Sequence, residues 1–128
     1  MALIIVSAKD REDAYDKVIK LKNKEAYAEE PKRFQDFIFD YKNEFEWYEN
    51  YLKLNLYGIS KVDNFEIKFI KIFTESVTRF LEENAKLENK IIEKYNLSFK
   101  KIRNYIGKLM KVLDFAEKNG DALVGLGD

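Results

Sequence analysis

The stretch SKVDNFEIKFIKIFTESVTRFLEENAKLENKIIEKY, residues 60–95, decides the expected fold, because its apolar residues recur every three or four positions. This spacing places them on one stripe of a helix. Each aromatic ring on the stripe can bury on the order of 150–250 Å², so other helices must cover it. The sequence therefore predicts a central helix over 60–95, with Ser60 as its N-cap and Asp63 beside its positive end. Whether that helix continues unbroken through 84–89 stays open.

Short apolar segments lie at both ends of the chain. LIIVSA at residues 3–8 and DALVGL at residues 121–126 are typical of short buried strands. A two-stranded ribbon becomes stable when it packs on helices. We therefore expect the strand at 3–6 to pair with the strand at 122–126 and to rest on the helical part of the chain.

Helical spacing and stop signals predict three further helices. The first runs over 11–23 after Asp10, the second begins at Pro31 and reaches the low fifties, and the last runs over 99–118 after Ser98. Residues 23–30 are expected to form a loop, and Gly120 is a good helix stop. The expected fold is a predominantly helical α+β domain over 1–128, with about four helices in a compact bundle and a small two-stranded sheet formed by the N- and C-terminal strands.

Length and charge set bounds on the class of protein. The chain has 128 residues, of which 46% are hydrophobic and 36% charged, as expected for one globular domain with solvated helix faces. Its 23 basic and 23 acidic residues balance, which disfavours a dedicated DNA-binding protein. No stretch approaches the roughly 18 apolar residues of a membrane span, and the N-terminus lacks the basic start of a signal peptide. We therefore expect a cytoplasmic protein without a membrane partner.

Residue types restrict the chemistry further. The chain contains no histidine and no cysteine, which excludes Ser-His-Asp and Cys-His triads and the usual zinc ligand sets. The acidic pairs Asp36 with Asp40 and Glu82 with Glu83 could serve a carboxylate-dependent magnesium enzyme. On amphipathic helices such carboxylates are usually solvated surface charges. The sequence therefore predicts a protein that is not an enzyme and has no cofactor and no metal site.

The predicted helix from residue 31 to the low fifties carries the clearest candidate for a binding surface. With 100° per residue, its apolar stripe leaves an opposite face that is acidic at one end and aromatic at the other. Tryptophan and tyrosine beside carboxylates are typical of protein-interaction hot spots. The alternative is a kink near Asn50 that turns the tryptophan ring into the core. The candidate partner-binding residues are Asp36, Asp40, Glu44, Trp47 and Tyr51.

This surface leads to the main functional hypothesis. The sequence predicts a small protein-binding module, most specifically an inhibitor of the immunity, antitoxin or anti-defence type. Its acidic-aromatic helix would cap a basic site on another protein, such as a nuclease-like toxin or defence enzyme, because carboxylates can occupy phosphate positions. An exposed aromatic face is also suited to a homodimer interface.

A second hypothesis rests on the C-terminal part of the chain. Between residues 84 and 112 basic side chains outnumber acidic ones by eight to two. This charge favours a nucleic-acid-binding accessory protein, with Tyr95 or Tyr105 stacking on bases. The competing interpretation is that these cations only solvate an outer helix face or pair with the acidic helix. The candidate nucleic-acid-binding residues are Lys100, Lys101, Arg103 and Lys108.

Overall fold

Four antiparallel strands form one sheet in the order β2-β1-β4-β3 in the computed structural model, which describes residues 3–19, 26–54 and 56–127. The strands are β1 (Ile4–Ala8), β2 (Tyr27–Glu29), β3 (Ile59–Val62) and β4 (Ala122–Leu126). In the central pair, Ile4 lies opposite Leu126 and Ala8 opposite Ala122. The predicted pairing of the two end segments is therefore confirmed. The prediction of a two-stranded sheet is wrong, because β2 and β3 add an edge strand on each side.

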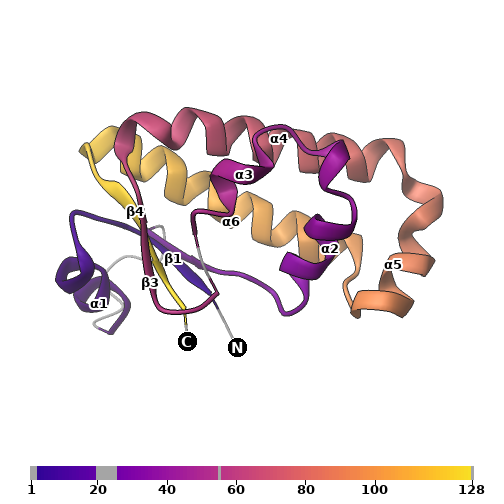
Figure 1. Cartoon of the computed structure of the whole chain (residues 1–128), viewed down its shortest axis with the longest axis horizontal. Coiled ribbons are helices and arrows are strands. Elements are labelled where there is room, and N and C mark those ends of the chain that lie inside the picture. Colours follow the sequence, from indigo (N-terminus) through magenta and orange to yellow (C-terminus); the bar gives the residue numbers. More distant parts are fainter. Residues whose placement is uncertain (1–2, 20–25, 55, 128) are drawn as a thin grey trace.

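Six α-helices lie within the described residues, and the mainly helical α+β class is confirmed. The two longest helices, α4 and α6, run side by side, while α5 lies at the end of the molecule farthest from the sheet (Figure 1). The short 3-10 turns η2 (Lys42–Glu44) and η4 (Ala85–Leu87) connect helices, and η3 (Asn64–Glu66) lies between β3 and α4. The helices are α1 (Arg11–Ile19), α2 (Phe34–Asp40), α3 (Tyr48–Tyr51), α4 (Ile67–Glu83), α5 (Glu88–Tyr95) and α6 (Phe99–Asn119).

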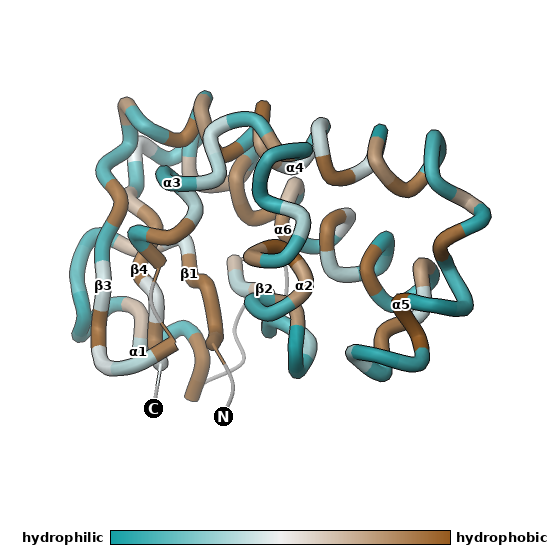
Figure 2. The backbone as a smooth tube through the Cα atoms, turned by 45° about the vertical axis from the view of Figure 1, so that its right-hand side comes forward, coloured by the Kyte–Doolittle hydropathy of each residue, from teal (hydrophilic) through white to brown (hydrophobic). Residues whose placement is uncertain are grey.

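Both faces of the sheet are buried, which explains why its two central strands are apolar almost throughout. Leu3 and Ile5 belong to the main core with the long helices, whereas Val6 and Ala8 pack in a smaller cluster with Ala14 of α1. The hydrophobic colouring along β1 reflects this double burial (Figure 2). Helix α1 therefore covers one face of the sheet, and α6 packs against the other.

Three predicted helix-end signals are confirmed. The Asp10 carboxylate accepts a hydrogen bond from the backbone N–H of Asp13 at 2.9 Å, at the start of α1. The Ser98 hydroxyl accepts from the N–H of Lys101 at 3.1 Å, at the start of α6. Gly120 ends α6 with φ 68°, a conformation that glycine adopts without steric cost. The end of the predicted helix at residue 23 lies outside the described residues.

The predicted start of the central helix at Ser60 is wrong, and the continuity that the sequence left open is interrupted between α4 and α5. Its first residues form the edge strand β3, in which Val62 lies opposite Leu123, so Ser60 is not an N-cap and α4 begins only at Ile67. The sheet buries the apolar side chain of Val62, which the exposed first turn of a helix would leave in contact with water. At the other end, the side-chain amide of Asn84 donates to the carbonyl of Phe80 at 2.9 Å, and the chain turns before α5 begins.

The prediction of one helix from Pro31 to the low fifties is also wrong. The segment is divided into α2, η2 and α3, and the chain takes left-handed backbone conformations at Arg33 (φ 70°) and Trp47 (φ 57°). The break lets Phe45 reach Phe80 of α4, with ring centroids 5.3 Å apart. Packing of aromatic side chains against α4 thus breaks a segment whose helical spacing alone predicted one continuous helix. The predicted loop at 23–30 contains strand β2, and its residues 23–25 lie outside the described part of the chain.

Replacing Gly107 by alanine should stabilise the protein. Gly107 lies inside α6, and a Cβ atom added there would meet nothing within 4 Å. Glycine costs about 0.5–1 kcal/mol relative to alanine inside a helix, so Gly107→Ala is expected to raise the free energy of unfolding by that amount. Urea denaturation measures the change, and a loss of stability would contradict the prediction.

Candidate functional site

The acidic residues predicted to bind a partner lie on two different elements. On α2, Asp36 forms an ion pair with Arg33 at 2.6 Å. Asp40 accepts a hydrogen bond from the Tyr95 hydroxyl and contacts Lys94 at 3.0 Å, and these interactions, the first above all, lower the pKa of Asp40. Glu44 lies on η2 and is exposed. The three carboxylates therefore do not form one row along a continuous helix.

The two aromatic residues of the prediction are separated by the break in the chain. The Trp47 side chain is 46% exposed, so the alternative that places it in the core is wrong. Tyr51, in contrast, is fully buried, and its predicted position on the exposed face is wrong. Its ring stacks on that of Phe73 in α4, with centroids 4.5 Å apart. Of the aromatic pair, only Trp47 is available to a partner in this structure.

Trp47 borders a hollow of about 590 Å³ on the surface of α2, η2 and α3. Phe39, which is 57% exposed, and Leu52, which is 40% exposed, also line it. Soluble proteins expose single apolar side chains often, but large apolar side chains gathered around one depression are typical of an interaction surface. We call this surface the aromatic hollow; its lining includes Phe39, Lys42, Phe45, Trp47, Glu49 and Leu52.

The backbone at Trp47 is unusual. A left-handed conformation is rare for a bulky residue and costs on the order of 1–3 kcal/mol. The ring of Trp47 packs against Phe69 of α4, with centroids 4.2 Å apart, which fixes its direction. Just before this turn, the N–H of Glu46 donates to the Ser76 hydroxyl on α4 at 3.1 Å. Contacts with α4 therefore hold the indole ring at the rim of the hollow.

Negative charge lies close to the aromatic hollow. Glu44 and Glu49 are exposed, and neither carboxylate forms an ion pair or hydrogen bond within the described ranges 3–19, 26–54 and 56–127. Glu46 has a neighbour, because its carboxylate lies 3.6 Å from the guanidinium of Arg79. The ammonium of Lys42 lies over the ring of Phe39, 4.6 Å from its centroid. Glu49 therefore lines the hollow without an ion-pair partner among the described residues, and Lys42 adds one positive charge to the same lining.

One buried carboxylate with a strongly raised pKa was not among the predicted site residues. Glu30 follows β2 and is buried, and burial raises its pKa to about 7. Its carboxylate accepts hydrogen bonds from the Tyr51 hydroxyl and, at 2.7 Å, from the Gln35 side chain. The Tyr51 hydroxyl is in turn 2.6 Å from that of Tyr105 on α6. Glu30 therefore connects elements that are distant in sequence, and no local sequence pattern marks such a residue.

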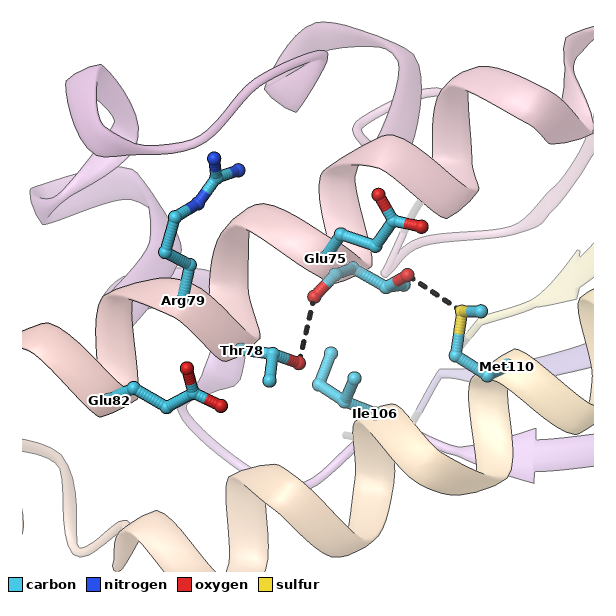
Figure 3. Close-up of a pocket in the computed structure, with 7 residues that line it drawn as sticks. Glu75, Thr78, Arg79, Glu82, Ile106 and Met110 are labelled. Carbon is cyan, nitrogen blue, oxygen red and sulfur yellow. Dashed lines mark hydrogen bonds between the residues drawn. The ribbon is translucent and has the colours of Figure 1, made fainter.

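A second depression, of about 450 Å³, lies between α4 and α6. Thr78 of α4 and the side chains Ile106 and Met110 of α6 approach each other across it, whereas Arg79 points away from α6 (Figure 3). The Thr78 hydroxyl donates to the carbonyl of Thr74 at 3.1 Å, and the Thr74 hydroxyl lies 2.8 Å from the sulfur of Met110. The hydroxyl groups of Thr74 and Thr78 therefore already form hydrogen bonds within the protein.

The predicted nucleic-acid-binding cations are exposed on α6, but their predicted stacking partners are not. Lys100, Lys101, Arg103 and Lys108 all lie on the solvent side of this helix. Tyr95 and Tyr105 are buried, so neither ring is accessible to a base, and that part of the prediction is wrong.

Three further observations concern the described residues. Among them, no group of three or more aspartate or glutamate side chains is placed to hold a metal ion. Every buried side-chain nitrogen or oxygen in the same ranges has a hydrogen-bond partner. Likewise, no helix in the described part of the chain has both the length and the apolar character needed to cross a membrane.

The aromatic hollow thus combines exposed apolar side chains, the carboxylate of Glu49 and the left-handed backbone at Trp47. Comparison of the chain with protein-family models, with curated proteins and with solved structures finds no match.

Proposed function

We propose that this protein binds another protein through the aromatic hollow. The observation that carries the proposal is the exposed Trp47 ring, held by Phe69 on a left-handed turn beside Phe39 and Leu52. Tryptophan is the residue most typical of interaction hot spots, because it buries a large area at a small cost in side-chain entropy. A partner that covers the ring buries this apolar area, which is exposed to water in the unbound protein.

The charges favour a partner with a basic site. Glu44 and Glu49 lack ion-pair partners among the described residues; Glu49 lines the hollow, and Glu44 belongs to η2, whose residues Lys42 and Asn43 line it. Carboxylates of this kind accelerate encounter with a positively charged surface, and the apolar contacts then lengthen the life of the complex. We infer that the function is inhibition, of the immunity, antitoxin or anti-defence type, with the hollow placed over the basic site of a nuclease-like target.

Replacing Trp47 by alanine should weaken binding of the partner. The wild-type protein, Trp47→Ala and Tyr15→Ala are to be used for affinity capture from native lysate, followed by titration with the purified captured protein. Tyr15 is the matched control, because its side chain is 40% exposed, similar to Trp47, but lies on α1. We expect Trp47→Ala to weaken binding at least tenfold and Tyr15→Ala to leave it unchanged. Equal capture by all three proteins would contradict the proposal.

The charge contribution is tested separately. The double variant Glu44→Gln/Glu49→Gln should slow association with the captured protein and reduce the dependence of the association rate on salt. An association rate that stays the same at low salt would show that these carboxylates do not steer the partner. A stable homodimer in sedimentation analysis, dissociated by Trp47→Ala, would assign the hollow to self-association instead and refute the inhibitor proposal.

A further inference from the structure

The outer face of α6 carries a line of lysines that form no ion pairs with other described residues. Lys100, Lys108, Lys111 and Lys118 fall within about 80° of one another around the helix, and the line extends over about 27 Å at 1.5 Å per residue. All four side chains are exposed, and none forms an ion pair with another described residue. Since the whole chain has a net charge of zero, this face is a local concentration of positive charge.

The acidic residues of the same helix cancel this charge only in part. Asp114 lies at the edge of the line, where its carboxylate is 2.6 Å from the ammonium of Lys71 on α4. Glu117 contacts the same ammonium from the side that faces α4. Both carboxylates are thus engaged across the helix pair, and they raise the pKa of Lys71 despite its partial burial. Because two carboxylates share one ammonium, one net negative charge remains beside the four lysines, and the outer face stays net positive.

The line of cations passes a depression that contains an aromatic ring. This hollow of about 390 Å³ is lined by Lys111, Asp114, Phe115, Lys118 and Asn119. The Phe115 side chain is partly exposed, and the ammonium of Lys17 lies 5.9 Å from its ring centroid. An accessible aromatic ring between lysines is the arrangement with which proteins bind single strands, because bases stack on the ring while phosphates contact the cations.

We propose that the outer face of α6 binds single-stranded nucleic acid. The phosphates contact Lys100, Lys108, Lys111 and Lys118, and one base stacks on Phe115 in the hollow between residues 111 and 119. The charge alone would also attract an acidic protein, but the aromatic ring favours a ligand with flat, unpaired bases. Lysine rather than arginine dominates the face, which fits binding to the backbone without recognition of a sequence.

Two labelled probes of equal charge separate the role of the base from that of the phosphate. Fluorescence anisotropy at low salt compares a 12-nucleotide oligothymidylate with an abasic phosphodiester of the same length. We expect the oligothymidylate to bind at least fivefold more tightly, and Phe115→Leu to remove this difference without weakening the abasic probe. Leucine keeps an apolar side chain against the helix, and a melting curve checks that the variant folds.

The matched charge control uses two double variants of equal net charge. Lys108→Glu/Lys111→Glu is expected to weaken both probes at least tenfold and to lower the salt dependence of binding. Lys61→Glu/Lys68→Glu reverses two exposed lysines on β3 and α4 and should change binding less than twofold. Equal weakening by the two double variants, equal affinity for the two probes, or tighter binding of a duplex than of the single strand would each overturn the proposal.

Discussion

Phe37→Ala is expected to lower the free energy of unfolding by about 3–5 kcal/mol, the range for truncating a buried phenylalanine. Phe37 is fully buried in α2. Its ring has five aromatic neighbours with centroids 5.5–6.1 Å away, and alanine would leave all of them facing a cavity. These neighbours are Phe34, Tyr41, Phe45, Phe80 and Tyr95.

Phe39→Ala is the matched control for this change. Phe39 lies on the same helix two positions later, but its side chain is 57% exposed at the aromatic hollow. We expect its replacement to cost less than about 1 kcal/mol of stability and to weaken partner binding instead. Guanidinium denaturation of both variants measures the difference. If Phe37→Ala proves too unstable to fold, Phe37→Leu should still lose more stability than Phe39→Ala, and equal losses would contradict this account of the core.

Glu30 should make the stability of the protein fall as the pH rises from about 4.5 to about 7. The ordinary pKa of this carboxyl is 4.5, and burial raises it to about 7 in the folded protein. Between these values the unfolded chain has released the proton that the folded protein still holds. Unfolding is therefore favoured by about 1.4 kcal/mol for each pH unit, or about 3 kcal/mol in all. Above pH 7 both states are ionised and this dependence ends.

Glu30→Gln isolates this contribution, because glutamine does not titrate and its carbonyl can still accept the Tyr51 hydrogen bond. The free energy of unfolding of Glu30→Gln minus that of the wild type should increase by about 3 kcal/mol from pH 4.5 to pH 8. Glu29→Gln, at the adjacent exposed position, serves as the control. Urea denaturation at several pH values gives all three curves. A difference that stays constant within about 1 kcal/mol would show that Glu30 is not held neutral in the folded state.

The sequence by itself predicted the features that depend on neighbouring residues. Continuous apolar runs marked β1 and β4, because a strand buried on both faces has no room for polar alternation. The caps at Asp10, Ser98 and Gly120 were readable because their hydrogen bonds or backbone angles involve residues within a few positions. The α+β class followed from these elements and from the helical spacing of α4 and α6.

Tertiary packing decided the rest. Helical spacing did not reveal that the chain breaks at Tyr41 and Trp47, because the break is stabilised by contacts with α4 that are distant in sequence. It also did not reveal that Tyr51 turns inward toward Glu30 and Tyr105, which form with it a buried network of residues distant in sequence. The sequence contained Trp47 as a candidate, but only the fold decided that its ring stays exposed. Local patterns determine the elements, whereas the competition among aromatic side chains for one core determines which of them remain at the surface.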